Sequence, residues 1–302
     1  MVLQTTNFDN IVGTTCKNIK FATVHEFTEY QKECWKFNKK EGTDIRSVQS
    51  MGYEGFGGAP EVTESGDITA VDFSEGYKTT ITQKQFAYET IVSWDQMRFA
   101  VKSAAFGGRI GFFLGRSANI RYEYLGTDTL TNGFTDSAAY HGGDSKPLFS
   151  ATHPWKVGGT YSNVLASADA SKTTISTAIK TVANAKMEQN IPANLTLTDI
   201  IFGYENVIDI PEILKSSLDP ESGNNRYNAL KDYGLNMLLL HYVTDTDATY
   251  YNTKDSELVI IEANSPFMKT EMYRNMDTGE KIFMSAKNGF RKPLGIFGNA
   301  GA

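Results

Sequence analysis

The sequence predicts an α+β fold, in which helices and strands occupy separate stretches of the chain instead of alternating regularly. Residues 93–126 have helical periodicity, residues 46–92 have the composition of paired strands, and short strand-like apolar runs follow residue 235. The chain has 302 residues, 40% of them hydrophobic, which is enough to bury a large core in one or two domains.

Residues 93–126 predict one long helix with a marked start and end. Ser93 can cap the first backbone N–H groups, and Gln96 can complete a capping box. Gly126 can supply a left-handed stop. At about 1.5 Å per residue such a helix would be roughly 48 Å long, so we name it the strut. A break at Gly107–Gly108 is the alternative.

Three glycines, Gly107, Gly111 and Gly115, fall four residues apart along one line of the strut. Each costs up to about 1 kcal/mol in a helix interior, so we expect another segment to approach this line closely. The uncharged run from Ile110 to Gly115 is far shorter than the ~20 residues that a bilayer requires, so no membrane span is expected.

The N-terminal part predicts a surface arm followed by a short helix. Residues 1–24 are polar and look irregular. Residues 24–40 place apolar side chains at helical spacing, which predicts an amphipathic helix. These side chains are Phe27, Tyr30, Cys34 and Phe37.

Residues 46–92 predict a β-hairpin excursion that leads into the strut. Between Ser47 and Gly76 the chain has no Lys or Arg, so the excursion carries a charge of −6. The excursion has too few apolar residues to fold alone, so it must lie on its own domain or on a neighbouring subunit. The six acidic residues are Glu54, Glu61, Glu64, Asp67, Asp72 and Glu75.

After the strut, residues 127–146 predict a polar loop. Ser171 should cap a helix that ends near Asn190, and residues 197–204 predict a buried strand that continues into a helix. Four further strand-like runs finish the chain, at residues 235–243, 258–262, 281–286 and 290–297.

The sequence carries few signs of chemistry. His141 with Asp144 is the best candidate pair, although a turn with two polar residues is the simpler interpretation. The chain has no nucleophile elbow and no phosphate-binding glycine motif, and its four histidines lack metal-ligand spacing. Cys16 and Cys34 predict reduced thiols. The net charge of −6 gives no general nucleic-acid footprint. We expect no catalytic residue, no cofactor and no metal.

An arm, a projecting acidic hairpin and a strut are typical of a protein that contacts copies of itself, because elements too thin to fold alone gain buried surface at subunit contacts. The order of these parts resembles the major capsid protein of tailed bacteriophages. Its shell fold was first described for phage Hong Kong ninety-seven and is shared with encapsulins. The chain is most similar to Mu-like major head subunits, through Ile91–Ser93, Leu148–Ser150, His153–Pro154, Gly158–Gly159 and Ile200–Leu214.

The resemblance implies a division of the chain into the parts of that fold. Residues 1–45 would form the N-terminal arm, residues 46–85 the extended loop, and residues 86–144 the peripheral domain with the spine helix at 94–125. Residues 145–280 would form the axial domain, and residues 281–302 would return as strands to the peripheral domain.

The implied function is mechanical. Many copies would form hexamers and pentamers of an icosahedral head that encloses double-stranded DNA without sequence-specific binding. Implied partners are further copies and, in addition, portal, scaffold and decoration proteins, with no membrane. The implied location is the virion, after assembly in the host bacterial cytoplasm.

Charge adds a hypothesis about the subunit contact. Five basic residues of the strut (Arg98, Lys102, Arg109, Arg116 and Arg121) oppose only Asp95 and Glu123, which gives +3 against −6 on the loop. We therefore expect the loop to meet basic residues of an adjacent subunit. The acids are Glu54, Glu61, Glu64 and Asp67, and the leading basic residues are Arg109 and Arg116. Alternatively, these arginines are solvated or pair within the chain.

Some members of the family crosslink their subunits covalently through a lysine in the extended loop. No lysine lies between Arg46 and Lys78, so we expect no such crosslink. We also expect no cleaved N-terminal scaffolding domain. Three alternatives stay open: an encapsulin-like compartment, another phage structural protein such as a tail component, and an unrecognised hydrolase or metal enzyme.

Overall fold

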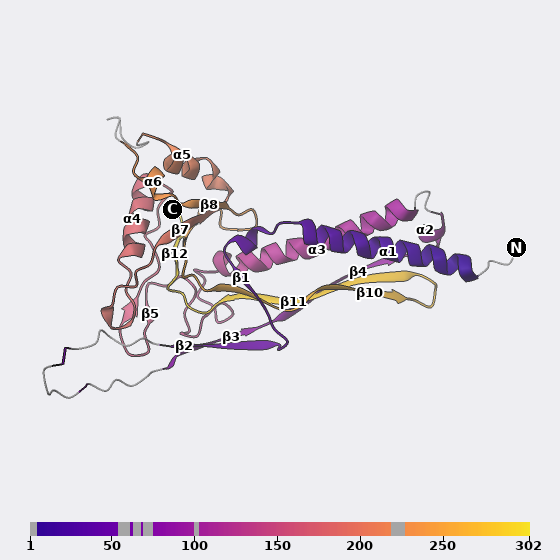
Figure 1. Ribbon diagram of the computed structural model, residues 1–302, viewed down its shortest axis with the longest axis horizontal. Coiled ribbons are helices and arrows are strands. Elements are labelled where there is room, and N and C mark those ends of the chain that lie inside the picture. Colours follow the sequence, from indigo (N-terminus) through magenta and orange to yellow (C-terminus); the bar gives the residue numbers. More distant parts are fainter. Residues whose placement is uncertain (1–4, 54–60, 63–67, 69–74, 100–102, 219–226) are drawn as a thin grey trace.

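The computed structural model describes residues 5–53, 61–62, 68, 75–99, 103–218 and 227–302. It has three parts (Figure 1): an elongated layer of helices over a sheet, a compact lobe at one end of that layer, and a two-stranded hairpin that extends from the centre. None of the described helices is long and apolar enough to cross a membrane.

The elongated layer contains the strut, and its N-terminal start is as predicted. The Ser93 Oγ accepts a hydrogen bond from the Gln96 N–H (3.2 Å), and the Gln96 Oε1 accepts one from the Ser93 N–H (3.2 Å). This reciprocal pair confirms the capping box. The helical segments are α2 (Trp94–Phe99) and α3 (Ser103–Thr131).

The strut has no break at its central glycines, but it ends later than the sequence predicts. Residues 100–102, between α2 and α3, lie outside the described residues. Gly107–Gly108 lie within α3, so the helix has no break there. The stop at Gly126 is wrong, because α3 runs on to Thr131 and takes in the start of the expected loop at residues 127–146. Gly126 instead allows a close approach, since a Cβ there would overlap the side chain of Cys34.

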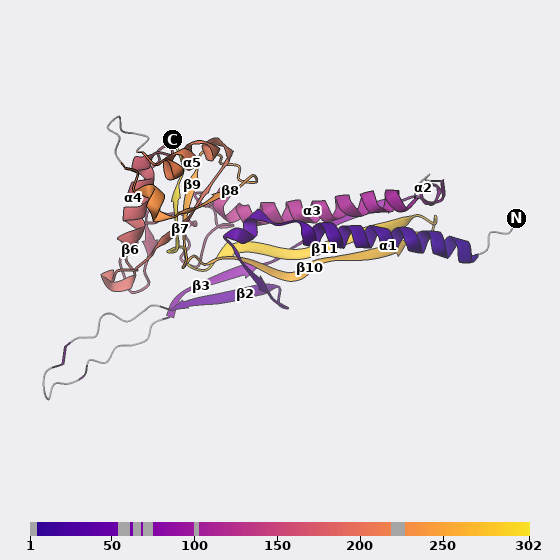
Figure 2. The same cartoon turned by 45° about the horizontal axis from the view of Figure 1, so that its top comes forward.

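The N-terminal expectation is wrong. Residues 5–29 form one helix, α1 (Thr5–Glu29), and the predicted helix at residues 24–40 is divided between three elements. They are the end of α1, a 3₁₀ turn η1 (Glu33–Lys36) and strand β1 (Lys39–Gly42). The helix α1 lies beside α3 in both views (Figures 1 and 2).

A four-stranded sheet lies under the helix pair. Its order is β1-β10-β11-β4, with β1 parallel to β10 and the other neighbours antiparallel. Side chains of α3 such as Leu114 and Tyr122 pack against Ile260 and Ile282 of the sheet. The longer strands are β10 (Leu258–Met272), β11 (Thr278–Phe290) and β4 (Lys84–Val92).

The compact lobe is built around a second sheet, of order β12-β9-β7-β8. Ser171 caps α4 as predicted, its Oγ accepting from the Thr174 N–H at 3.1 Å, but α4 ends at Ala183 instead of near Asn190. The lobe's main elements are α4 (Lys172–Ala183), β7 (Leu197–Phe202), α5 (Asp209–Lys215), α6 (Leu230–Tyr233), β8 (Asn236–Leu239), β9 (Thr249–Thr253) and β12 (Ile296–Asn299). Short pieces are β5 (His153–Pro154), β6 (Thr160–Tyr161), η2 (Glu188–Asn190) and η3 (Tyr204–Val207).

Two strands cross the boundaries expected from the resemblance. Strand β10 falls within residues 145–280, yet it pairs in the sheet under the helices. Strand β12 falls within residues 281–302, yet it pairs with β9 in the compact lobe instead of returning to that sheet. The chain therefore passes between the helix-covered sheet and the compact lobe more often than the expected domain boundaries suggest.

The hairpin is confirmed over its described residues. Strand β2 (Ser47–Tyr53) pairs antiparallel with β3 (Glu75–Thr82) in a register that joins Ser47 to Thr82. Only Thr79 and Ile81 of β3 are buried, and Ile81 packs against Val259 and Ile261 of β10. The hairpin is therefore anchored at its base.

Candidate assembly surfaces

The glycine line of the strut receives α1, as the spacing predicts. A Cβ on Gly115 would lie 2.7 Å from the Thr23 carbonyl oxygen, and one on Gly107 would lie 3.1 Å from that of Thr15. At Gly111 a Cβ would overlap the Ile19 carbonyl. The Thr23 hydroxyl donates to the Gly111 carbonyl at 3.0 Å. The backbones therefore touch, and any larger residue would separate the helices.

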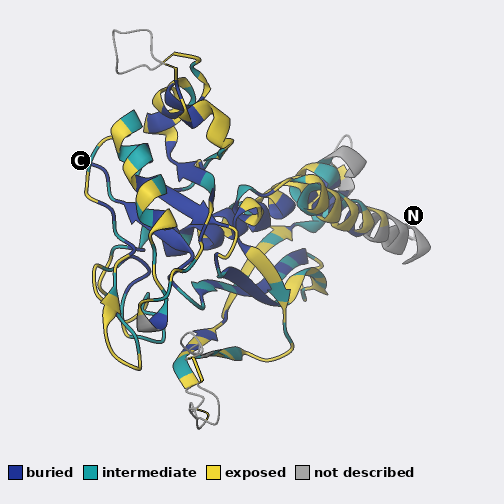
Figure 3. Cartoon of the chain, turned by 60° about the vertical axis from the view of Figure 1, so that its left-hand side comes forward, coloured by how far each residue is buried: buried dark blue, intermediate teal, exposed yellow. Residues whose placement is uncertain are grey.

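The other side of α3 is exposed and combines arginines with aromatic rings. Arg109 and Arg116 are both exposed, and Phe113 between them is 63% exposed. Neither arginine forms an ion pair with any residue that the structure describes. Exposed residues are visible along the helix pair in Figure 3. This outer face of the strut is available to another molecule.

The predicted acidic partners are only partly described. Glu61 is exposed, whereas Glu54, Glu64 and Asp67 lie outside the described residues. The strands β2 and β3 extend from the centre in the direction opposite to the N-terminal half of α3 (Figures 1 and 2). The structure does not bring Glu61 and the two arginines together within one chain.

A basic groove follows the edge of β4, the last strand of its sheet. The Arg121 guanidinium lies 4.0 Å from the ring centroid of Phe86. Both residues line two adjoining hollows of ≈ 480 and ≈ 490 Å³. Lys84 and Lys287 line the second hollow, where Lys287 pairs with Asp128 at 3.2 Å. The sequence identified Arg121 as basic, but no local pattern places the two lysines beside it.

Two buried carboxylates tie the segment between α1 and β1 to the strut and to its sheet. Glu123 accepts hydrogen bonds from the N–H groups of Glu33 (2.7 Å) and Cys34 (3.0 Å), and burial raises its pKa. Burial alone would also raise the pKa of Glu262, but hydrogen bonds from Lys40 and Tyr122 outweigh it and hold that pKa below its ordinary value. Glu123 is thus part of the interior and not of the strut's exposed charge.

Lys32 is buried in a ring of aromatic side chains. Its ammonium lies 3.9 Å from the ring centroid of Phe27 and 4.3 Å from that of Trp35, and it donates to the Phe27 carbonyl at 3.1 Å. Burial lowers the pKa of Lys32 to about 8. An amphipathic helix was expected over residues 24–40, but Lys32 lies between α1 and η1, and its side chain is buried.

The histidines form pairs and not a metal centre. His141 bonds Asp136 (2.6 Å), while Asp144 bonds His153 (2.6 Å), so the candidate pair of His141 with Asp144 is wrong. Within the described ranges, no three His, Cys, Asp or Glu side chains converge as metal ligands would. Cys16 and Cys34 are free and buried, and burial raises the pKa of Cys16 to about 12.

Comparison with known proteins gives matches by structure only. No family model matches the sequence, and no curated protein matches it. Among solved structures, a virus-like particle from Pyrococcus furiosus matches with a TM-score of 0.52 at 9% identity, covering 94% of this chain and 98% of that one.

Two phage structures match equally well. The mature capsid of bacteriophage PhiM1 gives a TM-score of 0.55 at 10% identity, covering 89% of this chain and 86% of that one. A chain of Microbacterium phage Oxtober96 gives 0.56 at 9% identity, covering 89% and 91%. Each match extends over nearly the whole chain. The chain therefore has the shell fold of tailed-phage major capsid proteins.

Proposed function

We propose that this chain is the major capsid subunit of a tailed bacteriophage. Copies assemble as hexamers and pentamers into an icosahedral head that encloses double-stranded DNA, with a mechanical role and no catalysis. The whole-chain likeness to capsid structures carries this proposal. Portal, scaffold and decoration proteins are its further partners, and the virion, assembled in the bacterial cytoplasm, is its location.

The surfaces of the single chain support an assembling role. Over its described residues the β2–β3 hairpin buries few side chains, and the outer face of α3 exposes, beside aromatic rings, arginines that pair with no residue the structure describes. A second copy that covers both would bury the surface that one chain leaves open.

The hairpin of one copy meets the strut of the next in this proposal. The loop acids Glu54, Glu61, Glu64 and Asp67 are the expected partners of Arg109 and Arg116. Both arginines are exposed and unpaired among the described residues, and the hairpin extends away from them within its own chain, which is why the contact is assigned to a neighbour.

A shell that encloses something other than DNA is the second candidate. The likeness to the Pyrococcus furiosus virus-like particle covers 98% of that chain, so the same parts occur in a particle not described as a phage head. The contents of the particle distinguish the two candidates.

Negative-stain electron microscopy and sedimentation velocity of the purified protein test the proposal. Closed shells tens of nanometres across are the expected result. Nuclease-protected DNA inside them would assign the phage head, and a protein cargo would assign the compartment. Tubes, open rings or a stable monomer, also when a scaffold protein is co-expressed, would contradict both candidates.

A further inference from the structure

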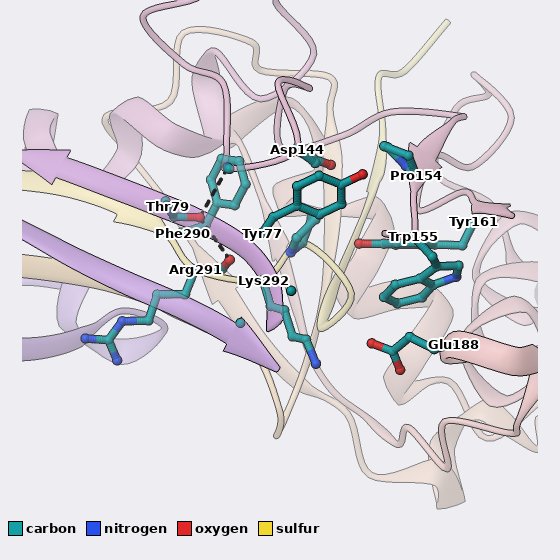
Figure 4. Close-up of a pocket in the computed structure, with 14 residues that line it drawn as sticks. Tyr77, Thr79, Asp144, Pro154, Trp155, Tyr161, Glu188, Phe290, Arg291 and Lys292 are labelled. Carbon is teal, nitrogen blue, oxygen red and sulfur yellow. Dashed lines mark hydrogen bonds between the residues drawn. The ribbon is translucent and has the colours of Figure 1, made fainter. Parts of the chain in front are cut away.

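A small cavity lies where three parts of the chain meet (Figure 4). The hairpin contributes Tyr77 from the first half of β3, the compact lobe contributes Trp155, Tyr161 and Glu188, and the segment after β11 contributes Lys292. Its volume is ≈ 50 Å³, which accommodates the end of a side chain or a very small molecule and not a nucleotide.

Glu188 has no evident structural role in this cavity. It begins η2 and is only 5% exposed, yet its carboxylate has no hydrogen bond or ion pair among the described residues. In Figure 4 the carboxylate points into the space between the compact lobe and the hairpin. The Glu188 oxygens border the cavity, so a positive group that enters it can lie beside the carboxylate.

The rest of the wall is aromatic. The rings of Trp155 and Tyr161 stack with centroids 4.4 Å apart, and the ring of His153 stacks on the other side of Tyr161 at 5.0 Å. His153 is already paired with Asp144 at 2.6 Å, so Asp144 is not available as a second acid. One free carboxylate among aromatic faces suits an organic cation, whereas a metal ion would need several oxygen ligands.

We propose that this cavity binds an alkylammonium group, with Glu188 as its counter-ion and Trp155 and Tyr161 as its aromatic wall. The group comes either from a small amine or from a lysine side chain of a second copy of the chain. The bound ammonium group would contact both the hairpin and the compact lobe. This inference does not depend on the proposed capsid function, because the cavity lies within one chain.

Lys292 is the competing cation within the chain. It lines the same cavity, yet no ion pair joins it to Glu188 in the described part of the structure. Removing its charge should therefore leave the affinity for an external ammonium unchanged or raise it. Removing the charge of Glu188 should abolish binding.

The experiment titrates the purified chain with methylammonium chloride, using sodium chloride at equal ionic strength as the reference. The readouts are the midpoint of thermal unfolding and tryptophan fluorescence, to which Trp155 contributes. Four proteins are compared: the wild type, Glu188→Gln, Lys292→Met and Glu205→Gln. Glu205→Gln is the matched control, since Glu205 is an exposed acid in η3, another short 3₁₀ turn of the compact lobe.

Methylammonium should raise the wild-type midpoint saturably. Glu188→Gln should weaken the apparent affinity at least tenfold, while Glu205→Gln and Lys292→Met should retain it. Without ligand, Glu188→Gln should unfold at a midpoint close to that of the wild type, because no described side chain pairs with its carboxylate. A lower midpoint would show that Glu188 is already paired within the chain and would overturn the proposal.

Particles, where they form, identify the source of the ammonium. One possible result is that methylammonium changes neither readout of the free chain, while Glu188→Gln particles dissociate at lower salt than Glu205→Gln particles. In that case the ligand is a lysine of a neighbouring copy. If the free chain does not respond and no particle shows this difference, the proposal is wrong.

Discussion

The α1–α3 helix pair and the β2–β3 hairpin differ in how closely they pack within the chain. In the helix pair, glycines remove side chains so that two backbones touch, and nothing else fits between them. In the hairpin, only two described residues, both in β3, are buried, and the others are exposed or half-buried. The glycine line has completed its packing within the chain, whereas the hairpin offers its surface to a partner.

This difference predicts where substitutions act. Changes along the glycine line should alter the stability of the single chain, because the contacts there are internal. Changes in the hairpin should leave the single chain stable and alter its association. The following experiments are ordered by their expected effect on the free energy of unfolding.

The largest effect is expected from Gly111→Ala. The added Cβ would overlap the Ile19 carbonyl, so the helices must separate, and overpacking of this kind costs about 1–3 kcal/mol. Gly108→Ala is the matched control, because nothing lies within 4 Å of its Cβ position. It should stabilise the helix by up to about 1 kcal/mol. Urea unfolding of both variants measures the difference, and equal effects would contradict the close contact.

Lys32→Met should have a pH-dependent effect of the order of 1–3 kcal/mol. The pKa of Lys32 is about 8 in the folded chain, below its ordinary value of 10.5, so between these values the unfolded chain binds more protons. The Lys32 contribution to stability therefore rises as the pH increases from 8 to 10.5.

The methionine variant should gain most relative to wild type below pH 8 and lose that gain above it. Urea unfolding of both proteins at a series of pH values measures this. A difference that stays constant with pH would show that the lysine is solvated.

The hairpin should respond differently to charge reversal. Glu61→Lys with Glu64→Lys should change the free energy of unfolding by no more than about 0.5 kcal/mol, because surface substitutions rarely do more. The same change should impair shell formation. Glu205→Lys with Asp255→Lys reverses two exposed acids outside the hairpin and serves as the control. Normal assembly of the hairpin variant, with unchanged salt dependence, would refute the contact with Arg109 and Arg116.

The smallest effect concerns covalent chemistry. The hairpin has no lysine between Arg46 and Lys78, so its contacts should be entirely non-covalent. Assembled particles should give a single band near 33.4 kDa on a denaturing gel. A ladder of crosslinked species would show that another lysine performs the reaction.

Some elements could be predicted because their signal is local. The capping box needs only Ser93 and Gln96, and the glycine line needs only a spacing of four. The same glycine logic gave the wrong role to Gly126, because a glycine that ends a helix and one that admits a neighbour look alike in sequence.

The helix α1 was missed because its sequence is polar and rich in threonine, which has low helix propensity. Its buried residues Thr15, Ile19 and Thr23 gain their packing from α3, about ninety residues away. The packing of Lys32 against Tyr122 and the pairing of His241 with Glu33 depend on the same kind of distant contact.

The sequence by itself determined the features that depend on neighbouring residues: the strut's start, the need for a close partner along its glycines, and an acidic hairpin too thin to fold alone. The tertiary structure decided which segment fills the glycine line, which strands share a sheet, and that Glu188 faces a cavity with no partner among the described residues. These features depend on contacts between residues far apart in the chain, and no local pattern specifies which distant groups will meet.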